Sequence, residues 1–440
     1  MARRLRALVV SYAFPPVGGA GVQRSVKLVK YLPEAGVDAE VLSVANPSVP
    51  LQDHTFEEDL RGAVVHRART LEPGYKVKQA TWTTTAGSQA RPSLKTRLLG
   101  KTVALARQLV VPDPQVLWVP GAAIELARIA RGYDVVVITA PPFSQFLLGP
   151  LARLGGPAVV LDYRDEWSTL RQSYEMLKGG LNARVSGPLE RELLRRADAI
   201  VAATPAFADN LRNEHPFLAD RPVHAISNGF DPDDFPHDLP EPPRDRLQLT
   251  YAGTVYRLTS PRTFLSAVRK VHEREPELAK LLRLRFIGRI VDTELDAFEG
   301  MEALGVERLG YVPHGELMHH LSSSHYTLCI ESDDPGVERI YPGKIFELMY
   351  LRRPVMSVAP EGVLTQLVRD LELGPIHRPD DVAGMTKTLV EALTSFRDAD
   401  GVIPAIDTPE HDARIAPYHR RALAARWAEV LREAVAHRQG

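Results

Sequence analysis

Short apolar runs rich in β-branched residues alternate with segments of helical spacing along the first half of the chain. The runs at residues 5–11, 39–44, 134–139, 158–161 and 199–203 predict buried strands, and residues 22–32 and 189–196 predict helices. Such alternation is typical of βαβ units, whose strands form a parallel sheet with helices on both faces. The first half is therefore predicted to be a doubly wound α/β domain.

The same pattern restarts after the Asn228-Gly229 turn. The strands of a second sheet are predicted at residues 247–252, 284–287, 326–330 and 354–358. A segment rich in proline and charge, residues 236–246, is predicted to be the hinge between the halves, and residues 418–436 are predicted to form a closing helix. At 440 residues the chain is too long for one ordinary core, so we predict domains at 1–228 and 229–414 and a helical segment at 415–440. Ligands of such sheets bind at the carboxyl ends of the strands, and a cleft between the halves is the expected site.

Composition narrows the class of protein. The formal net charge of −1 argues against a dedicated nucleic-acid-binding protein. Residues 1–228 hold 28 Lys and Arg against 21 Asp and Glu, and this basic half would suit an anionic acceptor or a membrane surface. The single cysteine, Cys329, excludes an internal disulfide and a cysteine zinc site, and we expect it in a buried strand. Without an apolar stretch of 18 residues or a full signal peptide, the predicted compartment is the cytoplasm.

A glycine-rich turn at residues 14–24 directly follows the first predicted strand and opens a helix. Backbone N–H groups of such a turn can approach an anion at the positive end of the helix dipole. A dinucleotide site is the rival interpretation, but Arg24 stands where the third glycine of that fingerprint belongs, and no acid ends the second strand. A tight strand–helix turn without a ligand is the other alternative.

Charged residues crowd the end of the strand predicted at 158–161. Asp162, Arg164 and Asp165 would be costly there unless solvated or paired, and this is the functional edge of the sheet. They are candidates for catalytic residues, and the alternative is an Asp–Arg ion pair that only holds the loop in place.

Farther along, Asp231-Pro232-Asp233 has the form of an Asp-x-Asp metal motif, but we interpret it as a turn, because that motif belongs to a single-domain architecture.

The most informative motif is residues 341–349, in which Pro342-Gly343 precedes an apolar-periodic stretch and marks the start of a helix. Lys344 falls in the first turn, where a cation opposes the helix dipole, so an anion is expected beside it. Glu347 lies three residues on and hence on the same face. The alternatives are that Lys344 projects into solvent and that Glu347 is an ordinary first-turn acid.

Five motifs in this order resemble those of the family-4 retaining glycosyltransferases. They are Phe-Pro-Pro-x-Gly-Gly, Asp-x-Arg-Asp-x-Trp, Asn-Gly-x-Asp-x-x-Phe, Tyr-Ala-Gly-Thr and Pro-Gly-Lys-Ile-Phe-Glu, and together they extend over essentially the whole chain. The resemblance implies the GT-B fold, which is two facing Rossmann-like domains with a C-terminal helix that crosses back to the first. It also implies that the N-terminal domain binds the acceptor and the C-terminal domain binds a nucleotide diphosphate-sugar, with no other cofactor.

The resemblance assigns roles residue by residue. Gly18 and Gly19 would offer backbone N–H groups to the donor, Gly253 and Thr254 would form the phosphate turn of the second domain, and Tyr311 and Val312 would lie in the base-binding loop. Lys344 would face the diphosphate and Glu347 would hold the ribose hydroxyls.

The sequence departs from the family in two places. Arg339 stands where an acid is usual, and the basic residues that commonly follow the Gly253 turn are not in place, so that Arg257 and Arg289 are the candidates for their role.

The implied reaction is sugar transfer with retention and without metal, because fixed cations can stabilise the departing diphosphate. The acceptor would be a glycan, a lipid-linked molecule or a natural product. Two alternatives stay open at this stage, a sugar-nucleotide epimerase on the same fold and a catalytically silent nucleotide-sugar-binding protein.

Residues 76–107 contain seven lysines and arginines and no acid. If residues 93–110 are helical, their leucines share one face and several of their cations lie mostly opposite. This pattern predicts either an ordinary surface helix or a peripheral contact with anionic lipid at the inner face of a membrane.

Overall fold

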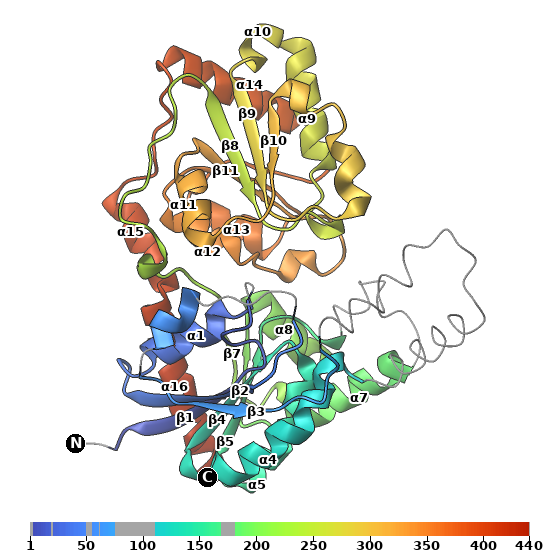
Figure 1. Cartoon of the computed structure of the whole chain (residues 1–440), viewed down its shortest axis with the longest axis vertical. Coiled ribbons are helices and arrows are strands. Elements are labelled where there is room, and N and C mark those ends of the chain that lie inside the picture. The colour runs from blue at the N-terminus through green and yellow to red at the C-terminus, as the bar shows by residue number, and fades with distance from the viewer. Residues whose placement is uncertain are drawn as a thin grey trace. The chain divides into compact units, whose positions relative to one another are not determined.

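The computed structural model describes residues 3–18, 21–49, 55–60, 62–74, 111–168 and 181–439. The chain forms two compact units (Figure 1). The first consists of Met1–Ser227 together with Arg420–Gly440, and the second is Asn228–His419. The chain therefore leaves the first unit once, builds the second, and returns.

The first unit is built on a seven-stranded parallel sheet of order β3-β2-β1-β4-β5-β6-β7. Its strands are β1 (Leu5–Val10), β2 (Val37–Val44), β3 (Val65–Ala68), β4 (Val135–Ala140), β5 (Ala158–Tyr163), β6 (Ala199–Ala202) and β7 (Val223–Ala225). Its α-helices are α1 (Gln23–Tyr31), α4 (Val119–Ile129), α5 (Gly149–Leu154), α7 (Leu181–Arg196), α8 (Pro205–Glu214) and α16 (Arg420–Gln439). Every residue of β4 and β5 is buried, as expected for central strands covered on both faces.

Helix α16 completes the core of this unit. It packs against α1 and against strands β4 and β5, and Leu423, Trp427 and Leu431 are buried there. The predicted return of the last helix to the first domain is confirmed.

The second unit is built on a six-stranded parallel sheet of order β10-β9-β8-β11-β12-β13. Its strands are β8 (Leu247–Ala252), β9 (Leu282–Ile287), β10 (Val306–Leu309), β11 (Tyr326–Ile330), β12 (Val355–Val358) and β13 (Ile376–His377). Its α-helices are α9 (Arg262–Arg274), α10 (Pro276–Ala279), α11 (His314–Ser322), α12 (Lys344–Tyr350), α13 (Val363–Asp370), α14 (Val382–Asp398) and α15 (Pro409–Ile415). The predicted fold class, two Rossmann-like units with parallel sheets, is confirmed.

The predicted hinge at residues 236–246 is wrong. That segment lies wholly inside the second unit, and the chain passes between the units after Ser227 and again after His419. Aromatic packing explains the difference, since the rings of Phe230 and Phe235 lie 4.9 and 4.5 Å from the ring of Tyr350 on α12. The chain is thus anchored in the second core before the proline-rich segment begins.

No helix in the described part of the chain is long and apolar enough to cross a bilayer. Residues 93–110, for which the sequence predicts a contact with anionic lipid, lie outside the described residues.

Candidate active site

Three neighbouring strands of the second sheet end at glycines. Gly253 follows β8, Gly288 follows β9 and Gly310 follows β10. Gly253 has φ +132° and Gly288 has φ +125°, in the region that favours glycine, and a Cβ on Gly288 would lie 2.5 Å from the carbonyl oxygen of Gly253. Side chains are therefore excluded from these two turns, which leaves backbone exposed at the carboxyl edge of the sheet.

Lys344 lies against this edge. Its Nζ is 3.9 Å from the centroid of the Tyr251 ring and 3.8 Å from the point that a Cβ on Gly253 would occupy. Among the described residues it forms no ion pair. Burial by itself would lower the pKa of Lys344, but Tyr251, Cys329 and Glu331 together raise it above its usual value. The edge thus holds a cation that forms no ion pair within the unit, although Glu331 acts on it electrostatically.

Glu331 immediately follows β11, the neighbour of β8 in the sheet. Its side chain is buried, and burial raises its pKa to about 7, against the opposing effect of Lys344. Its backbone N–H donates to the carbonyl of Val358 at 2.8 Å, which fixes the residue on the extended β11–β12 ladder. Cys329, two residues earlier, is also buried, as predicted, and the pKa of its thiol is raised to about 12 by burial.

Glu347, on α12, lies beside the start of α11. One carboxylate oxygen is 3.2 Å from Nε2 of His314, the first residue of that helix. The loop just before His314 carries Tyr311, which is 69% exposed, and Val312, which is partly exposed. An exposed aromatic ring and an oriented carboxylate are thus presented by adjacent elements.

The remaining residues predicted on this unit occupy the rim. Thr254 and Arg289 are exposed in the turns after β8 and β9. Arg257 is also exposed and pairs with Asp334 at 2.8 Å. Arg339, at the position where family-4 glycosyltransferases usually have an acid, forms an ion pair with its neighbour Glu338 at 2.6 Å.

The first unit carries a buried ion pair at its own carboxyl edge. Arg24 donates to both oxygens of Asp162, with its Nη2 2.7 Å from Oδ1 and its Nε 3.0 Å from Oδ2. Thr139 Oγ1 donates to the same carboxylate at 2.8 Å. Asp162 is only 1% exposed, so the pair is the structural Asp–Arg ion pair that the sequence left as an alternative. Its arginine is Arg24, not Arg164.

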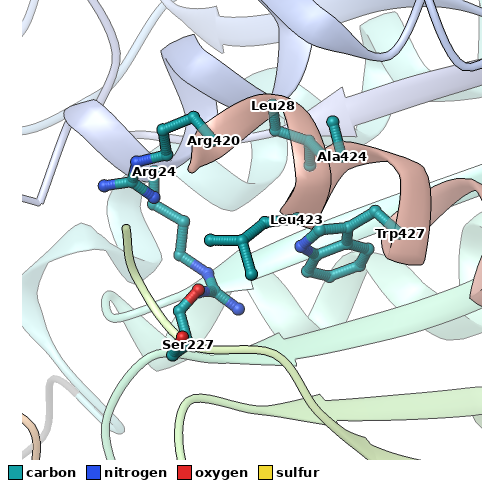
Figure 2. A pocket seen from close by; sticks show the side chains of 7 residues that line it. All are labelled: Arg24, Leu28, Ser227, Arg420, Leu423, Ala424 and Trp427. Carbon is teal, nitrogen blue, oxygen red and sulfur yellow. The ribbon is translucent and has the colours of Figure 1, made fainter. Parts of the chain in front are cut away.

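The Arg24 guanidinium also holds the segment through which the chain leaves the unit. It donates to the carbonyls of Ile226 and Ser227, both at 2.9 Å, and lies 5.6 Å from the ring of Trp427 on α16. Figure 2 shows Arg24, Ser227, Leu423 and Trp427 around a cavity of about 10 Å³. That volume is at the lower limit for one water molecule, so the cavity is no substrate pocket.

Arg164 and Asp165 lie in the turn after β5. Arg164 donates to the carbonyls of Gly21, Ala140 and Pro141, which ties this turn to the glycine-rich turn and to the end of β4. Burial lowers the pKa of Arg164, while Asp165 and Asp162 oppose that shift. Asp165 is exposed, Gly18 is partly exposed, and Gly19 lies outside the described residues.

The Asp231 region is a turn. The Asp231 side chain accepts from the backbone N–H of Asp233 at 3.2 Å and caps a short 3-10 helix, Pro232–Asp234. No group of three or more His, Cys, Asp or Glu residues in the described ranges could hold a metal ion.

The structure thus brings Gly253, Lys344, Glu347 and the base-loop candidates onto one unit, and Asp162, Arg164 and Asp165 onto the other. Sequence reasoning missed Tyr251, His314 and Glu331. Only Glu331 left a readable signal, which is an acid placed directly after an apolar strand run.

Residues 18–234 match the family model described as Glycosyltransferase Family 4. The chain is similar to the structure of Anabaena HepE in complex with UDP and glucose, with 14% identity, a TM-score of 0.61, and coverage of 97% of this chain and 99% of that one. It is also similar to sucrose-phosphate synthase from Thermosynechococcus elongatus, with 14% identity, a TM-score of 0.60, and coverage of 98% and 100%. The lipopolysaccharide outer core galactosyltransferase WaaB shares 11% identity, with a TM-score of 0.56 and coverage of 97% and 99%. No curated protein sequence matches this chain.

Proposed function

The chain belongs to glycosyltransferase family 4, whose members transfer a sugar from a nucleotide-sugar with retention of configuration, and from this we propose how its two units divide the work. The second unit binds the nucleotide diphosphate-sugar, and the first binds the acceptor hydroxyl. The observation that carries this proposal is Lys344, a cation that forms no ion pair in its unit and is set against a glycine-lined sheet edge.

Each element of the second unit then has a role in holding the donor. Lys344 and the backbone of Gly253 and Thr254 bind the diphosphate, with Arg257 and Arg289 at the rim. Glu347, oriented by His314, accepts hydrogen bonds from the ribose hydroxyls. Tyr311 offers an exposed ring on which the base can stack, with Val312 beside it.

The chemistry requires no enzymic nucleophile. The bond between the anomeric carbon and the diphosphate oxygen breaks, the acceptor hydroxyl attacks from the same face, and its proton passes to the departing diphosphate. Lys344 stabilises the charge that develops on that leaving group. On the first unit, exposed Asp165 positions the acceptor, Arg164 holds the turn that carries it, and buried Asp162 acts only through Arg24. The family resemblance assigns Gly18 and Gly19 the role of offering backbone N–H groups to the donor.

The test is a single assay that separates three outcomes. The protein is incubated with nucleotide-sugars and acceptor mixtures, and donor hydrolysis, epimer formation and transfer are measured together. We expect transfer to exceed the other two. Epimer formation alone, or binding without turnover, would contradict the proposal. A thermal-shift screen of nucleotide diphosphates identifies the base, because a ligand that binds the native state raises Tm.

Transfer is expected to survive excess EDTA. Magnesium at a diphosphate is usually held by clustered carboxylates, and the adjacent pair of acids that follows β11 is Asp333 and Asp334. Asp334 is already paired with Arg257. Lys344 supplies the charge that a metal would otherwise provide. Loss of activity with EDTA that magnesium or manganese restores would show that this charge assignment is wrong.

We propose that the enzyme works in the cytoplasm and contacts the inner face of the membrane through the basic segment at 93–110. The support is the sequence alone, which places seven cations and no acid within residues 76–107. The protein should co-sediment with vesicles that contain anionic phospholipid and be released by salt, because screening weakens such contacts. Equal recovery with neutral and anionic vesicles would remove this proposal.

A further inference from the structure

We propose that Glu331 is neutral in the donor complex, so that the enzyme takes up a proton as the nucleotide diphosphate-sugar binds. This inference rests on the proposed donor site and adds to it a residue whose protonation controls donor affinity.

The placement of Glu331 carries the argument. Its side chain is 8% exposed, and among the described residues Lys344 is the charged group that favours its ionised form. Glu331 directly follows β11, and β11 is the neighbour of β8 in the sheet. Strand β8 carries Tyr251, whose ring lies under the Lys344 ammonium. Glu331 and Lys344 influence each other electrostatically, yet they form no ion pair.

The ionisable groups around Glu331 leave it a single source of compensating charge. From α12 it faces Lys344 and from its own strand Cys329; β12 contributes no ionisable side chain. The pKa of Cys329 is raised to about 12, so its thiol is neutral. Glu338 and Arg339, in the loop that follows, pair with each other.

A bound nucleotide diphosphate-sugar brings two negative charges to Lys344. One ammonium cannot balance these and a buried carboxylate as well, and an uncompensated buried charge is costly. A neutral carboxyl group avoids that cost and gains an O–H donor, which a phosphate oxygen can accept. The pKa of Glu331 in the free enzyme is already about 7. The negative charge of the donor therefore needs to raise this pKa only a little further to keep the carboxyl group protonated near neutral pH.

The sign of the pH effect follows. Below pH 7 the carboxyl group is already protonated, so the donor binds without proton uptake. Above pH 7 a proton must be taken from solvent, and the apparent Kd rises by up to about tenfold per pH unit. Between pH 6 and pH 8 we expect Kd to increase roughly tenfold, with uptake approaching one proton per donor at pH 8.

The experiment is isothermal titration calorimetry of the full-length protein with UDP-glucose and GDP-mannose, at pH 6 and pH 8, in buffers of different ionisation enthalpy. Nucleotide-sugars are used because their diphosphate has no group that titrates in this range, unlike a free nucleoside diphosphate. Glu331→Gln should bind without the proton uptake at pH 8, and Asp333→Asn, a change of another acid two residues away, should retain it.

The outcomes separate the two proposals. Binding by the wild-type protein without proton uptake at pH 8, or uptake that persists in Glu331→Gln, overturns this inference and leaves the donor site standing. Absence of binding to both nucleotide-sugars and to every nucleotide diphosphate of the thermal-shift screen overturns the donor site and the inference together. The wild-type titration alone can overturn the inference, so the test does not depend on the folding of the variant.

Discussion

Replacement of Lys344 by alanine is expected to lower kcat about 100-fold or more. The reason is that the leaving diphosphate gains charge in the transition state, and a fixed cation in a water-poor site stabilises that charge by several kcal/mol. Lys344 is suited to this role because its ammonium lies over the Tyr251 ring and forms no ion pair. The substitution removes no ion pair, so Tm should change little.

Two further variants make this result specific. Glu347→Gln should mainly raise the KM for the donor, since its role is to bind the ribose. Lys270→Ala removes an exposed lysine from α9 of the same unit and should leave the kinetics unchanged. Wild-type kinetics in a folded Lys344→Ala protein would rule out Lys344 as the diphosphate ligand.

Replacement of Arg24 by methionine is expected to destabilise the first unit by about 3–5 kcal/mol. The variant leaves the Asp162 carboxylate buried with Thr139 as its one remaining hydrogen-bond donor among the described residues, and breaking a buried ion pair costs about this much. It also frees the carbonyls of Ile226 and Ser227. Arg24→Lys should recover only part of the loss, because one ammonium cannot replace a planar group that donates to the Asp162 carboxylate and to two backbone carbonyls at once.

Tryptophan fluorescence isolates this effect. All four tryptophans, Trp82, Trp118, Trp167 and Trp427, belong to the first unit, so urea unfolding followed by their emission reports that unit alone. Arg426→Ala is the matched control. It removes an exposed arginine that donates to the nearby carbonyl of Ala225, and its midpoint should stay near that of wild type.

A second substitution tests the cause. If the buried charge is responsible, adding Asp162→Asn to Arg24→Met should recover stability. A double variant no more stable than Arg24→Met would assign the effect to lost packing instead.

The strands that hydrophobic pattern predicted are central, and those it missed are peripheral. The four unpredicted strands, β3, β7, β10 and β13, are the two edges of each sheet. Central strands such as β4 are buried at every residue and leave a continuous apolar run in the sequence. Edge strands are short and partly exposed, as in Val306–Leu309, where two of the four residues are charged and exposed, so no run is left to read.

The site divides in a similar way. The motif at 341–349 led to Lys344 and Glu347, because local sequence reports a helix start and the residues on its face. It could not report Tyr251 beneath the ammonium or His314 beside the carboxylate, since those neighbours are brought together by sheet order and helix packing. Arg24 was noticed only as a misfit in a glycine pattern, because its partner Asp162 is 138 residues away.

The position of α16 has a consequence for the order in which the protein can be completed during synthesis. The second unit is continuous in sequence and has all of its residues once His419 has been made. The first unit, although begun earlier, lacks Leu423, Trp427 and Leu431 until residues 420–439 leave the ribosome. Its core stays open on the side that α16 covers while its neighbour is already whole, so the older half of the nascent chain is the last to close. A premature stop just after His419 would therefore damage not the unit in which it falls but the one translated first.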